Sequence, residues 1–261
     1  MTTESTSARR LDTADLESRV KSMYEEVALE PGREFHFETG RGLAERLGYA
    51  ARDLDAIPAA ALESFAGVGY FLDLADIEPA ETVLDLGSGS GMDSFLAAVA
   101  TGHEGEVIGV DMTTAQLAKA TRLAREGGFP QVQFREGYIE RPPVEDVSVD
   151  CVISNGVINL SPDKPTVFRA AATALRPGGR LALADIVSTR RLPEGITCDA
   201  SLWAACIGGA AQRDDYLAAI RDTGFEIETI RENDYRFVSE RAAGATATYG
   251  VVSIGLLARR A

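Results

Sequence analysis

The chain has 261 residues, of which 45% are hydrophobic and 25% charged, and its formal net charge is -14 with a pI of about 4.7. This composition is typical of a globular protein with one large domain, or one domain and a cap. An acidic field of this size repels phosphate backbones and no basic patch offsets it, so nucleic acids are not expected as partners. No apolar run reaches the roughly 18 residues of a membrane span, no signal-peptide pattern opens the chain, and three cysteines without paired spacing favour a reducing compartment. We therefore expect a cytoplasmic protein, not bound to membranes, that acts on a small molecule.

The first 70 residues carry helical patterns. Hydrophobic side chains recur at helical spacing over residues 15–28, and shorter helices are expected through Leu43 and Leu47 and near residues 58–65. We interpret residues 1–70 as a helical lid, or substrate cap, on a domain formed by residues 71–261. We expect the lid to cover the carboxyl ends of the strands, where ligands bind in doubly wound sheets.

An aromatic run, Phe35-His36-Phe37, follows the first expected helix, with Arg41 close behind. Folded over a ligand cleft, this segment would offer an aromatic-lined pocket, a base in His36 and an anion clamp in Arg41. A packed lid with a satisfied histidine is the alternative. Tyr24, on the preceding helix, could close over a cationic ligand through a cation–π contact.

From residue 82 onward, strand and helix patterns alternate. This alternation predicts an α/β fold with a Rossmann-like parallel sheet, and strand candidates near the end add an antiparallel hairpin, giving seven strands. The expected parallel strands are residues 82–86, 107–111, 132–136, 149–154 and 180–186. The expected helices are residues 92–100, 114–125, 165–175, 202–205 and 214–222. The terminal strand candidates are residues 225–230, 235–238 and 248–257.

A glycine-rich turn follows the first of these strands. Asp85 precedes Gly87, Gly89 and Gly91, and glycines at alternate positions let the chain bring bare backbone N–H groups against a ligand. The dinucleotide fingerprint G-x-G-x-x-G would place its third glycine where this chain has Met92. The spacing G-x-G-x-G after an acid instead resembles motif I of class I S-adenosylmethionine (SAM) methyltransferases. A SAM site is therefore favoured over a nicotinamide site.

A second carboxylate, Asp111, ends the next expected strand. In either nucleotide-binding fold, a carboxylate at this position accepts hydrogen bonds from ribose hydroxyls. The alternative is a helix N-cap, although Thr113 and Gln116 have the spacing to form the capping box instead. Asp111 therefore strengthens the case for a ribose-containing cofactor.

Two stretches are distinctive: residues 154–164, SNGVINLSPDK, and residues 202–209, LWAACIGG. Together with the broader stretches 83–98, 107–117, 136–140 and 175–185, they resemble the arsenite methyltransferase family from about Gly48 to the C-terminus. The chain is identified as a divergent member of this family. The resemblance implies the seven-stranded class I methyltransferase sheet, with SAM as the cofactor.

The resemblance also implies where SAM binds. The glycine turn would line the methionine portion, with Asp85 orienting its ammonium group, while Asp111 and Met112 hold the ribose. Residues 138–140 would frame the adenine, and the end of the fourth strand would lie beside the transferring methyl group. The expected cofactor-binding residues are Asp85, Gly87, Ser88, Gly89, Gly91, Asp111, Met112, Gln116, Gly137, Tyr138, Ile139, Glu140, Ser154 and Asn155.

The cysteine pattern departs from the family. Trivalent arsenic is thiophilic, so two or three thiolates hold it. Cys206 fills one family cysteine position, but Gly156 and Val68 stand where the family has others. Cys151, inside a strand, is expected to be an inert core thiol. Cys198 would lie about 12 Å from Cys206 along a single helix, too far to share an ion unless a loop folds back.

These departures favour an organic acceptor over arsenite, because Gly156 leaves room for a bulkier molecule. We expect SAM-dependent methyl transfer to a small organic molecule, without a metal, and with His36, Asn155 and Cys206 as catalytic residues. One alternative is methylation of arsenite or methylarsenite through Cys206 and external thiols. Another is a non-catalytic module that binds SAM or senses thiols. The expected substrate-binding residues are Tyr24, Phe35, Phe37, Arg41, Gly156 and Trp203, of which Trp203 could instead pack beside Cys206.

Overall fold

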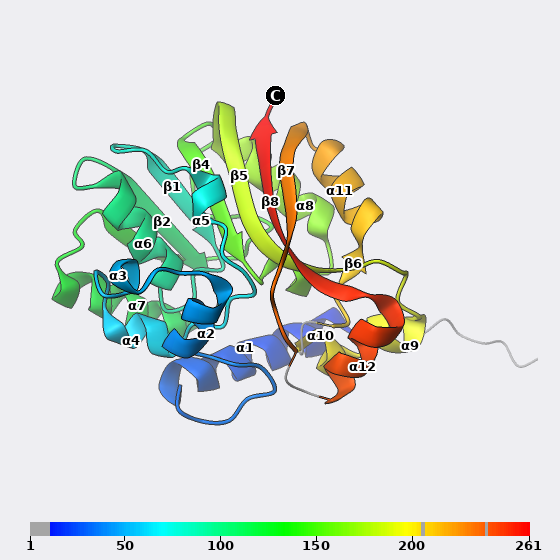
Figure 1. Ribbon diagram of the computed structural model, residues 1–261. Coiled ribbons are helices and arrows are strands. Elements are labelled where there is room, and N and C mark those ends of the chain that lie inside the picture. The colour runs from blue at the N-terminus through cyan, green and yellow to red at the C-terminus, as the bar shows by residue number, and fades with distance from the viewer. Residues whose placement is uncertain (1–10, 205–206, 238–239) are drawn as a thin grey trace, which may run out of the picture.

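A central sheet with helices on both faces organises the computed structural model, which describes residues 11–204, 207–237 and 240–261 (Figure 1). The strand order is β3-β2-β1-β4-β5-β8-β7. Strands β1 to β5 pair in parallel, and β8 runs antiparallel to both of its neighbours. The strands are β1 (Thr82–Leu86), β2 (Glu106–Asp111), β3 (Val132–Glu136), β4 (Val149–Asn155), β5 (Leu175–Ser188), β6 (Ala211–Gln212), β7 (Phe225–Asn233) and β8 (Val251–Arg260).

This order confirms the expected Rossmann-like α/β sheet. A short eighth strand, β6, pairs with the end of β5. The terminal strands differ from a simple edge hairpin, because β8 inserts between β5 and β7 and leaves β7 at the edge. Most residues of β8 are buried, as a strand inside a sheet requires.

Helices cover the two faces of the sheet. Alternate side chains of a strand point to opposite faces, so Val83 and Ile153 share a core with α6 and α7, whereas Leu84 and Val152 pack with α8 and α11. No helix of the described residues is both long and apolar enough to cross a membrane. The helices after β1 are α6 (Met92–Thr101), α7 (Thr114–Gly127), α8 (Lys164–Ala174), α9 (Glu194–Thr197), α10 (Ala200–Ala204), α11 (Arg213–Arg221) and α12 (Glu240–Tyr249), with a short 3-10 helix, η1 (Ile158–Leu160).

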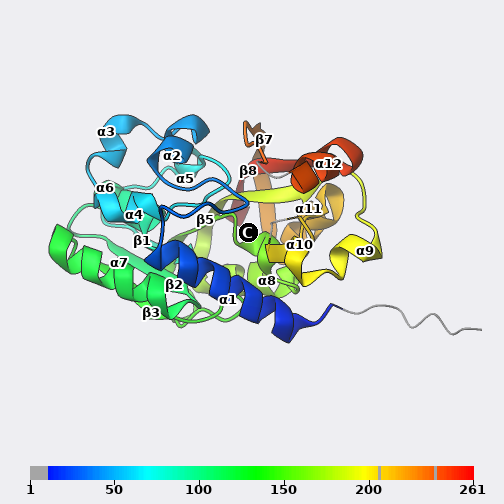
Figure 2. The same cartoon turned by 90° about the horizontal axis from the view of Figure 1, so that it is seen from below.

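The N-terminal helices form a layer of their own. The side chain of Asp12 caps α1 by accepting hydrogen bonds from the backbone N–H groups of Ala14 and Asp15. Helix α1 lies against α7 and α10 (Figure 2), and its Leu16 and Val20 belong to the same core as one face of the sheet. The lid thus shares the core of the larger domain, and the division at residue 70 stays an interpretation. These helices are α1 (Thr13–Leu29), α2 (Arg41–Leu47), α3 (Ala51–Leu54) and α4 (Ala59–Glu63), followed by α5 (Leu72–Ala75).

One strand expectation near the C-terminus is wrong, and the bounds of another are shifted. Residues 235–237 have no regular structure, because Tyr235 N bonds back to Asn233 O and its ring packs edge-on against Phe237, with centroids 5.0 Å apart. Residue 238 lies outside the described residues. The strand expected from residue 248 starts after Gly250, because residues 248 and 249 end α12 and Gly250, at φ 61°, turns the chain into β8.

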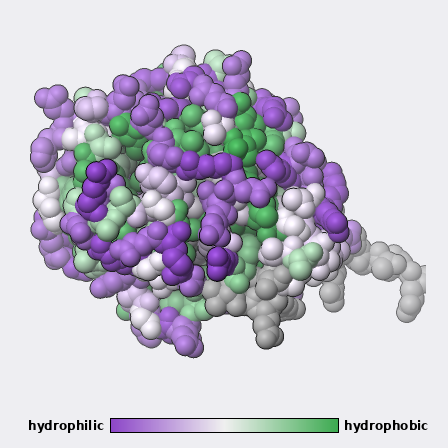
Figure 3. All heavy atoms as spheres, viewed as in Figure 1, coloured by the Kyte–Doolittle hydropathy of each residue, from purple (hydrophilic) through white to green (hydrophobic). Residues whose placement is uncertain are grey.

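Hydrophilic side chains dominate the face shown in Figure 3, with hydrophobic patches between them. This surface agrees with the acidic composition, whose formal net charge is -14. The large apolar side chains are mostly buried in the two core clusters. A ligand-binding cavity should therefore lie between secondary-structure elements.

Candidate active site

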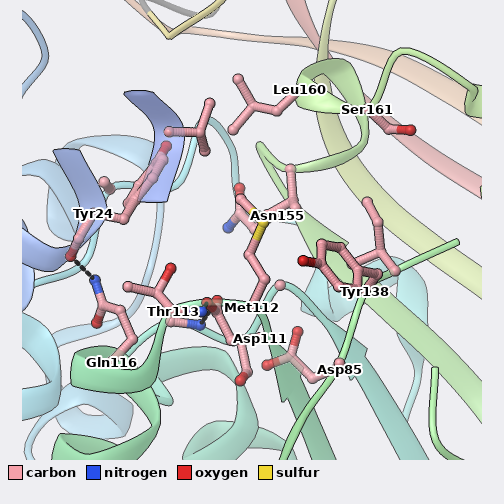
Figure 4. A pocket seen from close by; sticks show the side chains of 18 of the residues that line it. Tyr24, Asp85, Asp111, Met112, Thr113, Gln116, Tyr138, Asn155, Leu160 and Ser161 are labelled. Carbon is pink, nitrogen blue, oxygen red and sulfur yellow. Dashed lines mark hydrogen bonds between the residues drawn. The ribbon is translucent and has the colours of Figure 1, made fainter. Parts of the chain in front are cut away.

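A cavity of about 410 Å³ lies between the N-terminal helices and the carboxyl ends of the parallel strands (Figure 4). Its volume falls in the range of small-molecule sites. Residues of α1 and of the segment 61–67 line one side, which we call the lid side. The other, the strand-end side, contains the glycine turn after β1, Asp111, residues 137–140 and Asn155. The cavity thus occupies the position where doubly wound sheets bind ligands.

The glycine turn brings backbone to the cavity surface. Gly87 has φ +78°, and a Cβ added to it would lie 2.4 Å from Val157 Cγ2, so a side chain has neither the conformation nor the space. Gly87, Ser88 and Gly89 line the cavity. Ser88 Oγ is buried there without a hydrogen-bond partner among the described residues. Gly91 does not line the cavity; it precedes α6 and packs against aromatic rings.

Asp111 joins the glycine turn to the start of α7. Its Oδ2 accepts from Gly89 N at 2.9 Å and its Oδ1 accepts from Thr113 N at 2.8 Å. Burial raises the pKa of Asp111, and these backbone hydrogen bonds oppose that rise. The alternative capping box is not formed, because the Thr113 side chain makes no cap hydrogen bond and Gln116 Nε2 instead donates to Tyr24 O at 2.9 Å (Figure 4). The Thr113 side chain and the backbone N–H of Met112 also donate to the Asp111 carboxylate.

Met112 and residues 137–140 also line the cavity. Tyr138 donates its hydroxyl hydrogen to Glu17 Oε1 at 2.6 Å and accepts from Lys21 Nζ at 2.9 Å. The Lys21 ammonium also lies 5.0 Å from the centre of the Tyr138 ring. These contacts tie the loop after β3 to α1 and close the cavity at that end.

Asn155, at the end of β4, links the sheet to the lid. Its Nδ2 lies 3.0 Å from each of three acceptors, Tyr49 OH, Gly69 O and Asp93 Oδ2. Its Oδ1 accepts from Val68 N at 2.8 Å. Because every polar atom of this amide is engaged, Asn155 fixes the chain at residues 68 and 69 over the strand ends while one face of it lines the cavity.

The neighbours of Asn155 do not line the cavity. Ser154 is buried, and its hydroxyl donates to a backbone carbonyl of β1 at 2.9 Å. Gly156 has φ +72°, and a Cβ on it would lie 3.0 Å from Val68 Cγ1. The room expected beside Gly156 is therefore filled by Val68, and the two positions where the family has cysteines lie against each other.

Two functional candidates, Asp93 and Tyr49, were not expected from the sequence. Tyr49 OH donates to Asp93 Oδ1 at 2.7 Å, and Asp93 lines the cavity. Burial raises the pKa of Asp93 to about 6. Burial also raises the pKa of Asp85 to about 8, with the negative charge of Asp93 as the second cause. The acid in the first turn of α6 was a usable signal for Asp93, whereas Tyr49 is brought in by packing of the lid.

The aromatic run of the lid does not reach the cavity. His36 is exposed and packs edge-on against Phe37, with ring centroids 4.8 Å apart. Phe35 stacks on Phe37, which in turn lies 6.1 Å from the ring of Tyr24, the residue that lines the cavity. Arg41 is exposed and forms ion pairs of 2.8 and 2.7 Å with two acidic side chains. The run therefore supports Tyr24 from behind.

The cysteines and Trp203 also lie away from the cavity, as far as they are described. Cys206 is outside the described residues. Cys151 is buried in β4, which raises its pKa to about 12 and keeps the thiol protonated. Cys198 is half-buried at the end of α9, and Trp203 is buried, with Nε1 donating to Thr197 O at 2.8 Å. In the described ranges, no three His, Cys, Asp or Glu side chains gather as metal ligands.

The curated relatives point to one family. Residues 77–233 match the family described as Methyltransferase domain. The arsenite methyltransferase of Halobacterium salinarum is 40% identical over 225 residues, which cover 85% of this chain and 57% of the relative. The arsenite methyltransferase of Homo sapiens is 38% identical over 152 residues, 55% of this chain and 40% of the relative. The chain thus spans about half the length of the curated relatives it matches.

Solved structures agree with this result. The arsenic (III) S-adenosylmethionine methyltransferase from Chlamydomonas reinhardtii matches with a TM-score of 0.63 and 32% identity, covering 85% of this chain and 74% of that one. A geranyl diphosphate methyltransferase matches with a TM-score of 0.67 at 20% identity, covering 95% of this chain and 100% of that one, and this likeness shows the fold alone. From these matches and the strand-end geometry, the chain belongs to the methyltransferase-domain family, within the arsenite methyltransferases of the class I SAM-dependent enzymes.

Proposed function

We propose that the protein transfers the methyl group of SAM to a small organic acceptor. One observation carries this proposal: a single cavity has a polar strand-end side and an apolar lid side. Hydrogen-bonding groups at strand ends suit a nucleoside cofactor, and an apolar wall suits the carbon skeleton of an organic molecule. The apolar part is formed by Leu16, Val20, Tyr24, Phe65, Val157 and Leu160.

The residues on the strand-end side fit SAM. Asp111 lines the cavity beside Met112 at the end of β2, where a carboxylate can accept hydrogen bonds from ribose hydroxyls. Asp85 and Asp93 present carboxyl groups suited to the ammonium and sulfonium charges. When bound, SAM supplies an electrophilic methyl group on sulfur, so the protein has to position the acceptor and exclude water.

The network around Asp93 suits the acceptor. With a pKa of about 6, Asp93 is ionised at neutral pH. Tyr49 and Asn155 each occupy one of its oxygens and hold it against the cavity. An ionised carboxylate in this position can accept the proton that a hydroxyl or amine acceptor loses on methylation. Asn155 would act through this network as a positioning residue, since its own polar atoms are engaged.

The contact between Val68 and Gly156 supports an organic acceptor over arsenite. Thiolates are the ligands that trivalent arsenic requires. The family cysteine positions at these two residues are occupied by an apolar side chain and a glycine, which lie in contact. The described part of the cavity wall contains no cysteine. An arsenic ion would therefore depend on Cys206 and on thiols from solution.

The test is methyl transfer from isotopically labelled SAM to a panel of phenols, amines and thiols, with products identified by mass spectrometry. We expect a labelled organic product from the wild-type protein and a strongly reduced yield from Asp111→Ala. SAM binding without any methylated product would contradict the proposal and favour a non-catalytic module.

Arsenite methylation is a second candidate function, because the curated relatives are arsenite methyltransferases and Cys206 matches a family cysteine. Incubation with SAM and arsenite, with and without glutathione, tests this candidate. Product formation that needs glutathione and disappears in Cys206→Ser would support it. The double variant Val68→Cys/Gly156→Cys should gain arsenite methylation if the missing thiols are what the chain has lost. An active Cys206→Ser would remove the thiolate mechanism.

A further inference from the structure

The charged residues that line the cavity are all acidic. The lining residues of the described chain include Glu17, Asp85, Asp93, Asp111 and Glu140, and no lysine, arginine or histidine. Such a wall creates a negative potential that a ligand feels at short range and in a partly water-excluded space. The charge of the ligand should therefore matter for binding.

Two of these carboxylates already have partners at the edge of the cavity. Glu17 Oε1 accepts from Lys21 Nζ at 2.7 Å and from the Tyr138 hydroxyl at 2.6 Å. Glu140 Oε1 accepts from Ser161 Oγ at 2.5 Å. The ammonium of Lys21 thus offsets the charge of Glu17, whereas the partner of Glu140 is uncharged.

The three deeper carboxylates receive hydrogen bonds from uncharged donors. Asp85 Oδ2 accepts from Ser94 Oγ at 2.5 Å. Asp93 accepts from a tyrosine hydroxyl and an asparagine amide, and Asp111 accepts from two backbone N–H groups. Figure 4 shows Asp85 and Asp111 side by side at the base of the cavity. None of the partners named for these carboxyl groups carries a positive charge, so no ion pair neutralises Asp93 or Asp111 when they are ionised. Asp85, with a pKa of about 8, is largely protonated at neutral pH.

Two further lysines near the cavity wall donate to other groups. Lys119 Nζ donates to Ala28 O and Ser64 Oγ, on the outer side of the segment that lines the cavity. Lys164 Nζ donates to Asn159 O and Ser161 O and lies 4.9 Å from the ring of Trp203. Neither ammonium is part of the lining. Both therefore act on the cavity only from behind its wall.

The pKa values of these three carboxyl groups are all raised, and burial is the main cause. Burial raises the pKa of Asp85 to about 8 and that of Asp93 to about 6, and it also raises the pKa of Asp111. The negative charges of Asp93 and Asp111 raise the pKa of Asp85 further. A cation in the cavity would favour the ionised forms and release protons.

We propose that the cavity selects its ligands by charge: it favours the cationic methyl donor over the uncharged product and rejects anionic acceptors. This inference rests on the proposed function, because it takes SAM as the donor. SAM carries a sulfonium, an ammonium and a carboxylate, so its net charge is positive. Loss of the methyl group leaves the neutral thioether S-adenosylhomocysteine, which is held by the same hydrogen bonds but without the sulfonium attraction. The acceptor is accordingly a neutral or cationic organic molecule.

The experiment compares the dissociation constants of SAM, sinefungin and S-adenosylhomocysteine by calorimetry. Sinefungin carries an amine in place of the sulfonium and serves as a second cationic probe. Between about pH 8 and about pH 5, the affinity for SAM and sinefungin should fall about tenfold more than the affinity for S-adenosylhomocysteine. Asp93→Asn should reduce the same preference several-fold near pH 8, and SAM should release more protons on binding than S-adenosylhomocysteine.

Asp185→Asn is the matched control. Asp185 is also fully buried, with a pKa raised by burial to about 6 and a hydrogen bond of 2.7 Å from Tyr216 OH, but it does not line the cavity. The Asp185→Asn substitution should leave the preference for the cationic ligands unchanged. Thermal unfolding of both variants checks that they fold, and the pH series on the wild-type protein needs no substitution.

The inference would be overturned if the preference for the cationic probes changed neither with pH nor in the Asp93→Asn variant. This outcome would leave SAM binding intact. Methylation of a carboxylate- or phosphate-bearing acceptor as fast as its neutral counterpart would overturn the acceptor half. Failure to bind SAM at all would instead remove the proposed function.

Discussion

The two sides of the cavity are held in place by different kinds of contact. The strand-end side depends on local geometry. Gly87 N, directly after β1, donates to Val110 O of β2, and Gly89 N donates to the carboxylate of Asp111 at the end of β2. The lid side depends on long-range contacts, such as Tyr49 OH with Asp93 and Gln116 with Tyr24 O. This difference implies that the strand-end side, the proposed donor site, is formed by the sheet itself, whereas the lid side, the proposed acceptor site, depends on how the lid docks. The experiments below test that division.

The largest effect is expected from Gly87→Ala. Its positive φ and the contact of 2.4 Å that a Cβ would make with Val157 should together cost about 2–4 kcal/mol of unfolding free energy. Denaturant unfolding measures this loss. Gly178→Ala is the control, because Gly178 has φ +76° with nothing within 4 Å, so it carries the backbone strain alone. Equal losses in the two variants would show that the close approach to Val157 is not important.

Asp111→Ala should weaken SAM binding by roughly 1–3 kcal/mol, because it removes charge-assisted hydrogen bonds to the ribose and releases Gly89 N. Calorimetry measures the change. Glu136→Ala is the control, since Glu136 is an exposed acid at the end of the neighbouring strand β3. An unchanged affinity in Asp111→Ala, or a preference for NAD, would rule out the assigned cofactor position.

Asp85→Asn should separate stability from binding. Since burial raises the pKa of Asp85 in the folded state to about 8, folded protein holds this proton more tightly than unfolded protein does. Its contribution to stability is therefore present at low pH and is lost as pH rises from about 4 towards 8. Near pH 8 the free energy of unfolding of the variant should exceed that of the wild type by more than about 1.4 kcal/mol, the value of one pKa unit. The variant should nevertheless bind SAM less tightly. A variant less stable than wild type at that pH would refute this account.

Tyr49→Phe should act on the lid side of the division. The Tyr49 hydroxyl lowers the pKa of Asp93, so its removal should raise that pKa above about 6 and shift the acidic limb of the pH–rate profile upward. The matched variant is Tyr70→Phe, which alters a ring packed 4.8 Å from that of Tyr49. If both profiles coincide with wild type, the Tyr49–Asp93 contact has no role in methyl transfer.

His36→Ala should have the smallest effect, less than about twofold on the rate of methyl transfer. His36 is exposed, and its ring packs against Phe37, which in turn lies beside Tyr24 of the cavity wall. Substitutions on exposed surfaces usually change stability by no more than about 0.5 kcal/mol. A loss of a hundredfold or more would restore His36 as the base expected from the sequence. Tyr24→Ala, which alters the lining itself, provides the comparison.

Much of the strand-end side could be predicted from the sequence. Asp85, Gly87, Asp111 and residues 137–140 all lie at the ends of consecutive strands, and every one lines the cavity. Parallel strands bring their carboxyl ends to one edge of the sheet, so the residues that end the strands in the sequence are also the residues that form the site. Gly91 and Ser154 were placed there as well, but they serve packing and a backbone hydrogen bond.

The lid and the sheet edge were decided by tertiary structure. No local pattern places Tyr49 against Asp93, fills the space at Gly156 with Val68, or inserts β8 between β5 and β7. The aromatic run around His36 has the composition of a binding segment, yet it packs behind Tyr24. Turn chemistry at a strand end is fixed by a few consecutive residues. The docking of a helix depends instead on side-chain packing between segments far apart in the chain, for which the sequence carries no short-range signal.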